Sequence, residues 1–338
     1  MRLSISASSC INPGIFSTTL SEKENTPSDT GDFQLGQIDY QAHIAARQLR
    51  RLSKVAKMGI YCAKDCMAQA AGRKAEALIV ATSTGGFSAL DNFISHMIKQ
   101  EEQNLSPVHF LQSLLSDVTG QIVLSMGIEG YTTTYTNRGS AFESSILDAQ
   151  LLLEEHPEHT ILVGGTDELP TAYGDIIRHS RFLQITPKKD QPIPLGENAI
   201  FFALSKAGPS DDVYIADCRS YLGLEKSNAA TELADFLATN QIASTEIDAV
   251  FSGFYDEAQF ESFFPLSDLK KNVVFFKQYC GEFPTSTAYG VWLAEQVLDG
   301  KISPEALELP TTLRPKNILV INQFRASNFS FTLISANQ

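Results

Sequence analysis

Apolar runs and helically spaced segments alternate along the first half of the chain. Continuous apolar runs of this length are typical of strands buried on both faces, and apolar residues three or four positions apart indicate helices. The pattern predicts strands at 3–7, 75–83, 160–168 and 198–206, and helices at 42–72, 90–99, 110–126 and 141–155. We therefore expect an α/β protein with largely parallel, buried sheets.

The second half repeats this alternation after a Gly-Pro break near residue 208. It predicts strands at 213–223, 247–254, 272–279, 317–324 and 329–336, and helices at 229–239 and 286–298. Two similar halves, 1–208 and 209–338, suggest an internally duplicated, layered architecture that forms one unit. The polar stretch Ser17–Gly36, which contains Pro27 and Gly31, is expected to be a loop.

Composition narrows the possible partners. The chain has 338 residues, of which 43% are hydrophobic and 19% charged, as in ordinary folded domains. A net charge of −13 argues against a nucleic-acid or anionic-membrane partner. We see neither a membrane-length apolar run nor a secretion signal. Five cysteines form no paired motif, and Cys62 and Cys66 are expected to be buried thiols, so a cytoplasmic location is the simplest interpretation.

The segment from Gly127 to Ala149, GIEGYTTTYTNRGSAFESSILDA, has the layout of a turn that presents a nucleophile. A Gly-bounded loop leads into a short β-branched strand, a tight polar corner and then an amphipathic helix. The corner itself is Asn137-Arg138-Gly139, which carries no nucleophile. The geometry of a reactive site is therefore predicted without its reactive group.

Six segments resemble β-ketoacyl synthases, in the order and spacing of that family. They are RRLSKVAKMGIYCAKDCMAQAA (50–71), SPVHFLQSLLSDVTGQIVLSMGIEGYTTTYT (106–136), ILVGGTDE (161–168), PLGENAIFFALSK (194–206), FFKQYCGEFPTSTAYGVWLAEQVL (275–298) and NILVINQFRASNFSFTLISA (317–336). The resemblance spans nearly the whole chain. It implies a thiolase-like, duplicated α/β/α/β/α layered fold.

The same resemblance locates the family's catalytic positions. Its elbow cysteine carries the acyl chain as a thioester, and two histidines of the second half support decarboxylation and stabilise the oxyanion. Here the three positions fall on Gly139, Gly253 and Glu282, while the family's lysine is retained as Lys277. No histidine follows residue 179, so the second half supplies neither histidine. The resemblance thus implies an inherited elbow without its chemistry.

Each of these positions also has a simpler structural explanation. Gly139 is expected to serve the backbone, because elbow corners favour a positive φ, although a gained function stays open. Ser140 is the next hydroxyl, and Cys280 is the one cysteine near the old site; either is an alternative nucleophile, and Cys280 is otherwise a packed thiol. Lys277 and Glu282 are expected to form a structural ion pair rather than to act as acid and base.

Two further clusters are candidates for partner contacts. One is basic and is either a solvated helix face or a docking site for an acidic acyl carrier protein: Arg47, Arg50, Arg51, Lys54 and Lys57. The other has helical apolar spacing and is expected in the core, or at an interface that lines a substrate pocket: Phe110, Leu111, Leu114 and Leu115.

The VTGQI segment (118–122) resembles the chain-length factors of type II polyketide synthases. The resemblance therefore implies a non-catalytic, chain-length-factor-like subunit that pairs with an active ketosynthase and meets an acyl carrier protein. The pathway would be polyketide, aryl polyene or fatty-acid-type elongation, with neither a cofactor nor a metal. The alternatives are an acyl transferase or hydrolase with a displaced nucleophile, Cys280 or Ser140, and a scaffold protein that retains the fold.

Overall fold

The computed structural model describes residues 1–14, 31–179, 193–208, 211–265, 269, 272–325 and 328–337. The predicted polar loop Ser17–Gly36 therefore lies, as far as residue 30, outside the described residues. The strands are β1 Leu3–Ile11, β2 Ala77–Ala81, β3 Thr132–Tyr135, β4 Ile161–Asp167, β5 Asn198–Lys206, β6 Val213–Tyr221, β7 Ala249–Ser252, β8 Val273–Phe275, β9 Asn317–Phe324 and β10 Asn328–Ala336.

The helices alternate with these strands, as the pattern predicts. The α-helices are α1 Ala46–Leu49, α2 Lys54–Gln69, α3 Phe87–Lys99, α4 Pro107–Gln112, α5 Asp117–Met126, α6 Ala141–Glu155, α7 Thr171–His179, α8 Lys226–Thr239, α9 Glu257–Phe263, α10 Lys277–Cys280 and α11 Ser286–Leu298. Short 3₁₀ turns are η2 Tyr40–Ala42, η3 Arg138–Ser140, η4 Ser244–Glu246 and η6 Pro304–Leu307. None of the described helices combines the length and the apolar character needed to cross a bilayer.

The strands form one sheet whose order is β3-β2-β4-β5-β1-β6-β10-β9-β7-β8. Read inward from its edge, the first half has the order β3-β2-β4-β5-β1 and the second half has the order β8-β7-β9-β10-β6. Corresponding strands of the two halves therefore pair in the same way. In each half, two pairs are parallel (β2 with β3 and β4, β7 with β8 and β9) and the remaining pairs are antiparallel.

The expectation of largely parallel sheets was therefore wrong. The bridge between the halves, β1 with β6, is antiparallel as well. An apolar run buried on both faces has the same composition in either orientation, so the sequence pattern does not distinguish the two. The division into 1–208 and 209–338 stays a prediction.

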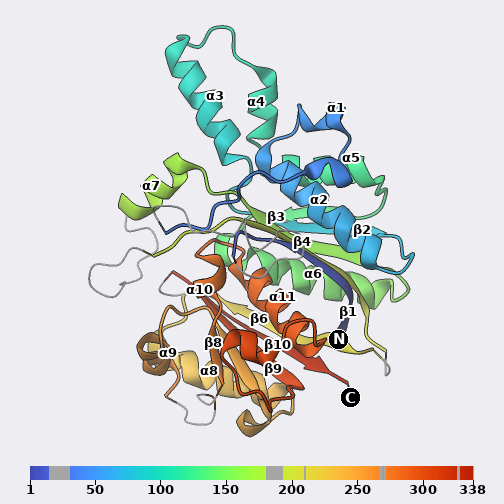
Figure 1. Cartoon of the computed structure of the whole chain (residues 1–338), viewed down its shortest axis with the longest axis vertical. Coiled ribbons are helices and arrows are strands. Elements are labelled where there is room, and N and C mark those ends of the chain that lie inside the picture. Colours follow the sequence, from blue (N-terminus) through green and yellow to red (C-terminus); the bar gives the residue numbers. More distant parts are fainter. Residues whose placement is uncertain are drawn as a thin grey trace.

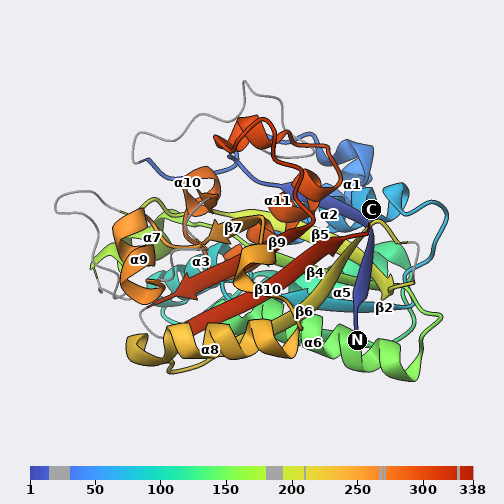
Figure 2. The same ribbon diagram turned by 90° about the horizontal axis from the view of Figure 1, so that it is seen from below.

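Helices cover this sheet in layers (Figures 1 and 2). α6 and α11 pack between the two halves, because α6 contacts β2, β4 and also β6, and α11 contacts β9, β10 and also β1. α2 and α5 cover the outer face of the first half, where their apolar residues pack with β2, β4 and β5. α8 and α9 cover the outer face of the second half. The result is the α/β/α/β/α layering expected of the thiolase-like fold.

Two predicted helices are broken, for identifiable reasons. The helix expected at 42–72 is replaced by η2, α1 and α2, since Ser53 caps a new helix by accepting a hydrogen bond from the Ala56 N–H. The helix expected at 110–126 ends at α4 and resumes at α5. Between them the Ser113 hydroxyl donates to the Phe110 carbonyl, a local bond that competes with helix continuation.

Candidate functional site

The elbow consists of β3, the turn η3 and the start of α6. Gly139 lies in this turn and is buried, but its φ is not positive; the left-handed residue is Arg138, with φ of 58°. The expected reason for Gly139 was therefore wrong. A Cβ at this position would lie 2.3 Å from Cβ of Phe324, so glycine is required by the close approach of Phe324.

The last three residues of β9 contact two of the inherited positions, Gly139 and Gly253, and the retained Lys277. Phe324 covers Gly139, as described above. The Gln323 carbonyl accepts a hydrogen bond from Lys277 Nζ at 2.6 Å. Asn322 Oδ1 would lie 2.1 Å from a Cβ placed on Gly253. One strand end thus fills the space in which a nucleophile and its supporting side chains would meet.

Lys277 and Glu282 form the ion pair that the sequence suggested. Lys277 Nζ lies 2.7 Å from Glu282 Oε2, and both side chains are fully buried. The Tyr255 hydroxyl donates to the same carboxylate oxygen. Burial raises the pKa of Glu282, while the neighbouring Lys277 acts in the opposite direction. Burial also raises the pKa of Tyr255 well above its ordinary value, so this phenol is a neutral donor rather than a base.

Beside this pair lies a small cavity of about 10 Å³. Its lining residues come from both halves and include Thr84, Asp167, Glu168, Tyr173, Leu195, Glu282 and Phe324. A space of this size holds about one water molecule. An acyl chain therefore has no room here.

Two acidic residues at the end of β4 give this small cavity its electrostatic character. Asp167 is well satisfied, because it accepts hydrogen bonds from the N–H groups of Ser83 and Thr84 at 2.8 Å and from the Thr285 hydroxyl at 2.8 Å. Glu168 accepts one from the Ser88 N–H at 2.6 Å, but its Oε2 is buried without a partner among the described residues. Burial raises the pKa of both carboxyl groups.

Glu168→Gln is expected to make the chain more stable at pH 8 than the parent, with a smaller gain at pH 4. A carboxyl group whose pKa is raised on folding binds its proton more tightly in the folded state. Its contribution to stability therefore falls as the pH rises from about 4.5 towards the raised value. The amide keeps the acceptor for Ser88 and never ionises.

Urea unfolding at both pH values, which lie on either side of the ordinary glutamate pKa of 4.5, measures this difference. Glu154→Gln, at an exposed position of α6, is the matched control and should change neither value. A gain from Glu168→Gln that is equal at pH 4 and pH 8 would show that the charge on Glu168 is not its cause.

The two candidate displaced nucleophiles are poorly placed for catalysis. Cys280 is fully buried, and burial raises the pKa of its thiol well above the ordinary value, although Lys277 acts the other way. Ser140 is buried as well, and its hydroxyl has no hydrogen-bond partner among the described residues. A serine needs an adjacent base to become nucleophilic, and Ser140 contacts none.

The basic cluster is not a single helix face. Arg47 belongs to α1, Arg50 and Arg51 to the following turn, and Lys57 to α2. Lys54 forms an ion pair within the chain, because its Nζ lies 2.5 Å from Oε1 of Glu197, a carboxylate buried in the protein. Glu197 also accepts the N–H groups of Leu35 and Leu169. Lys54 therefore serves the fold, and the three arginines are the exposed part of the cluster.

The apolar candidates near α4 lie outside both the core and the small cavity beside Glu282. Phe110, Leu111, Leu114 and Leu115 are 38–56% exposed, and none of them lines the cavity beside Glu282. In Figure 1, α3 and α4 project from the rest of the chain as an arm. The possibility that these four residues form core was wrong, while their place at an interface or in a shared pocket stays a prediction.

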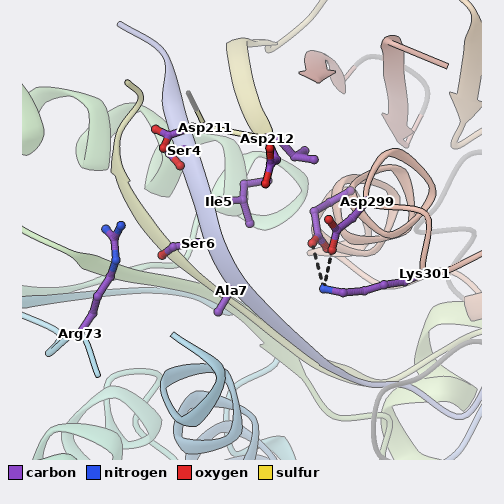
Figure 3. A pocket seen from close by; sticks show the side chains of 11 residues that line it. Ser4, Ile5, Ser6, Ala7, Arg73, Asp211, Asp212, Asp299 and Lys301 are labelled. Carbon is purple, nitrogen blue, oxygen red and sulfur yellow. Dashed lines mark ion pairs between the residues drawn. The ribbon is translucent and has the colours of Figure 1, made fainter. Parts of the chain in front are cut away.

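A larger cleft, of about 270 Å³, lies at the other end of α11 (Figure 3). Its lining is polar, with Arg73, Asp211 and Asp212 among the residues drawn. Lys301 is held there by Asp299 at 2.8 Å and by the buried Glu295 at 3.9 Å. Paired charges do not suit an acyl chain, so we do not assign substrate binding to this cleft.

Several residues of the old site could not be singled out from the sequence. Tyr255 and Phe324 reach it only through the packing of separate elements. Arg138 was part of the quoted corner, but its left-handed backbone has no composition signal, because such a conformation is uncommon outside glycine. Asp167 and Glu168 did carry a signal, since two acidic residues directly follow a buried apolar run.

Comparison with known proteins agrees with this geometry. The profile of the family described as "Beta-ketoacyl synthase, N-terminal domain" matches residues 22–190. No curated protein sequence matches the chain.

Solved structures with the same fold are numerous, and three illustrate it. The ishigamide ketosynthase/chain length factor gives a TM-score of 0.77 at 13% identity, covering 100% of this chain and 99% of that one. AntDE:AntF, a type II PKS acyl-carrier protein in complex with its ketosynthase, gives 0.77 at 15%, covering 99% of each chain. The ketosynthase ApeO in complex with its chain length factor ApeC, from Xenorhabdus doucetiae, gives 0.72 at 17%, covering 99% and 98%.

Proposed function

The chain belongs to the β-ketoacyl synthase N-terminal domain family, and we propose that it is a non-catalytic, chain-length-factor-like member that pairs with an active ketosynthase. The observation that carries the proposal is the contrast between two regions. The inherited catalytic position is filled by the end of β9 and leaves room for about one water molecule. Apolar residues are instead exposed on the surface beside the elbow.

This apolar surface is concentrated in one part of the sequence. Among the described residues, thirteen large apolar side chains are exposed, and eleven of them lie between residues 94 and 151. They come from the arm and the turn that follows it, from α5, from the residue before β3 and from α6: Ile94, Ile98, Val108, Phe110, Leu111, Leu114, Leu115, Leu124, Tyr131, Leu147 and Leu151. Exposed apolar residues concentrated in this way mark a site of protein association.

An open sheet edge accompanies this surface. Among the described strands, β3 stands at the end of the order and pairs with β2 alone. Beside it the Tyr131 hydroxyl donates to Asp148 of α6 at 3.0 Å, which places Leu147 and Leu151 of that helix close to the strand. An unpaired edge of β-branched residues readily adds a strand from another chain. We propose that the partner ketosynthase covers β3 and the apolar surface together.

The alternatives are less well supported. A displaced nucleophile would require Cys280 or Ser140, and both are buried. Burial raises the pKa of the Cys280 thiol, and the Ser140 hydroxyl has no hydrogen-bond partner among the described residues. A scaffold that merely keeps the fold gives no reason for the exposed surface between residues 94 and 151. We keep Phe110, Leu111, Leu114 and Leu115 as candidates for a pocket shared with the partner, and polyketide, aryl polyene or fatty-acid-type elongation as the process.

The proposal extends to a carrier protein and a location. Arg47, Arg50 and Arg51 are exposed and basic on an acidic chain, and an acyl carrier protein of opposite charge suits them. The complex of AntDE with its acyl-carrier protein shows that relatives of this fold meet such a partner. All five cysteines are free and buried, which supports a cytoplasmic location.

Co-purification with an active ketosynthase encoded beside this chain tests the proposal. We expect a one-to-one complex, and we expect the chain alone neither to condense nor to decarboxylate malonyl-carrier protein. Leu147→Glu/Leu151→Glu should weaken the complex at least about a hundredfold, because an unpaired charge buried in an interface costs several kcal/mol.

Leu222→Glu, at an exposed apolar position outside this surface, is the control and should bind as the parent does. A stable monomer that does not bind the ketosynthase would exclude this interface, and so would unchanged binding by Leu147→Glu/Leu151→Glu. Turnover by the isolated chain, lost in Cys280→Ala or Ser140→Ala, would instead establish the displaced-nucleophile alternative.

A further inference from the structure

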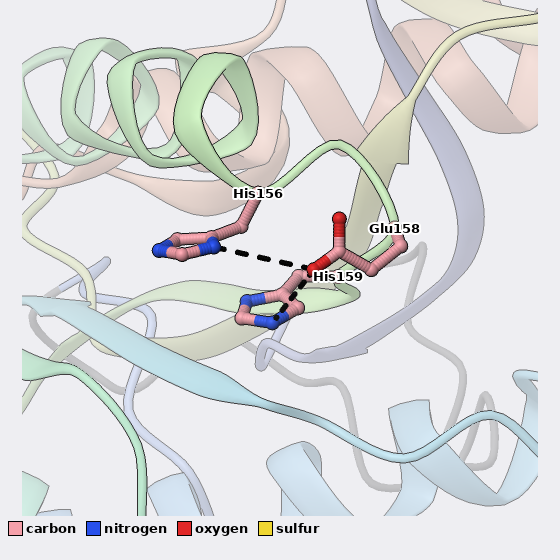
Figure 4. A group of neighbouring side chains, drawn as sticks. All are labelled: His156, Glu158 and His159. Carbon is pink, nitrogen blue, oxygen red and sulfur yellow. Dashed lines mark ion pairs between the residues drawn. The ribbon is translucent and has the colours of Figure 1, made fainter.

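The turn between α6 and β4 carries three side chains of metal-binding type: His156, Glu158 and His159 (Figure 4). One ligand atom of each lies within 4.8 Å of the other two. We propose that this turn binds a divalent transition metal ion, with Zn²⁺ as the reference ion. The expectation from the sequence was that the chain needs no metal, and this site lies apart from the elbow, at the opposite end of α6.

The backbone of the turn brings the two histidines together. His156 follows the last residue of α6, and the His159 N–H donates to the His156 carbonyl at 3.1 Å, which closes a four-residue turn. Pro157 occupies the second position of the turn, where its fixed φ is favourable. The turn is anchored in the sheet, because Glu76 accepts the Thr160 N–H at 2.7 Å. The first and fourth side chains of such a turn therefore lie on one side.

The distances suit a small ion. Glu158 Oε1 lies 3.4 Å from His159 Nε2 and 4.0 Å from His156 Nδ1. Two ligands of a tetrahedral zinc ion, each bonded at about 2.0–2.2 Å, lie about 3.4 Å apart. The Glu158–His159 spacing already fits, and the Glu158–His156 spacing needs a contraction of about 0.6 Å. The His156 side chain is 48% exposed, so its ring is free to turn and shorten this distance.

The donor set indicates the class of ion. The carboxylate oxygen faces a nitrogen of each imidazole ring. The two rings are stacked, with centroids 4.7 Å apart and planes inclined by 13°, so the exposed His156 ring has to turn out of the stack before both nitrogens can bind one ion. Two imidazoles and one carboxylate favour Zn²⁺, Cu²⁺, Ni²⁺ or Co²⁺ over Mg²⁺ and Ca²⁺, which prefer oxygen ligands. The exposed side of the turn leaves further positions to water.

The surroundings limit the expected affinity. A zinc-ligating imidazole is usually held by a hydrogen bond from its second nitrogen, and that bond is worth about 10–100-fold in affinity. Nδ1 of His159 is buried without a hydrogen-bond partner among the described residues. We therefore expect micromolar binding. Surface thiolates do not compete, because all five cysteines are buried.

Titration of the untagged, chelator-treated full chain with Zn²⁺ by calorimetry tests the proposal. We expect one ion per chain, and at least about tenfold weaker binding in His156→Ala and in His159→Ala. His96→Ala and His109→Ala remove histidines elsewhere and serve as controls that bind as the parent does. In parallel, Zn²⁺ should raise the thermal midpoint of the parent and of both controls, but not that of His156→Ala/His159→Ala.

The thermal midpoint without metal separates loss of a ligand from loss of fold, since all variants should agree there. Glu158→Gln preserves the shape of the turn and should still weaken binding. Zn²⁺ binding that is unchanged in the double histidine variant, or absent from the parent at millimolar Zn²⁺, would overturn the proposal. Neither result would bear on the ketosynthase partner, because that experiment uses a different surface.

Discussion

Lys277→Met is expected to destabilise the chain by about 3–5 kcal/mol, because it leaves the Glu282 carboxylate buried without its partner. The two side chains are fully buried and 2.7 Å apart. Lys277 also donates to the Gln323 carbonyl at 2.6 Å, and that acceptor loses its donor in the variant. Urea unfolding of the isolated chain at pH 8 measures the change in the free energy of unfolding.

A double-mutant cycle separates the pair from its surroundings. Lys277→Met/Glu282→Gln removes both charges and keeps an acceptor for the Tyr255 hydroxyl. It should lose much less stability than Lys277→Met, because a neutral pair of similar volume often replaces a buried ion pair at little cost. If the double variant is as unstable as the single one, Lys277 does not stabilise the chain through its ion pair with Glu282.

The exposed ion pair Arg219–Asp235 provides the control for this cycle. The two charges lie 3.1 Å apart, but the Asp235 side chain is 67% exposed. Water screens such a pair, and its loss costs about 1 kcal/mol or less. Asp235→Asn should therefore change stability little. A comparable loss in Asp235→Asn and Lys277→Met would show that burial does not set the energetics of the inherited site.

Much of the fold could be predicted from apolar patterning. The bounds of α6, β5, α11 and β9 agree with the predicted segments, because a buried apolar run or a continuous amphipathic stripe defines each of them. Strand orientation could not be predicted, since β5 and β10 are buried on both faces and have the composition of parallel strands. Helix breaks such as the one before α2 depend on a single serine cap, which is a weak signal within an alanine-rich stretch.

The sequence predicts which catalytic side chains are missing from the inherited site, but it does not predict how the site is packed. The missing cysteine and histidines follow from the sequence and its resemblance to the family, and the Lys277–Glu282 pair was expected because that resemblance places both residues in the old pocket. The part played by β9 was not, because Asn322, Gln323 and Phe324 meet Gly253, Lys277 and Gly139 only across the folded core. The close packing of β9 against the site explains why glycine occupies two of the three positions, which the sequence alone does not explain.

Gly139→Cys places a thiol at the position that the family uses for its nucleophile, and we expect it to destabilise the chain rather than to restore acylation. Any Cβ here would lie 2.3–2.5 Å from three atoms of Phe324, among them its Cβ. A clash with Cβ is not relieved by rotating the ring, so the backbone of β9 or of the elbow has to move. Overpacking a dense core typically costs about 1–3 kcal/mol.

Gly139→Ala should show the same loss in urea unfolding, which attributes it to the Cβ and not to the thiol. Gly120→Ala is the matched control: Gly120 lies within α5, and nothing stands within 4 Å of its Cβ position. It should stabilise the chain by about 0.5–1 kcal/mol, as alanine does in an open helix position. A loss of stability in Gly139→Ala together with a gain in Gly120→Ala would establish that Phe324 closes the elbow. If Gly139→Cys is instead as stable as the parent and becomes acylated by an acyl-carrier substrate, the site is open, and the loss of catalysis rests on the missing side chains alone.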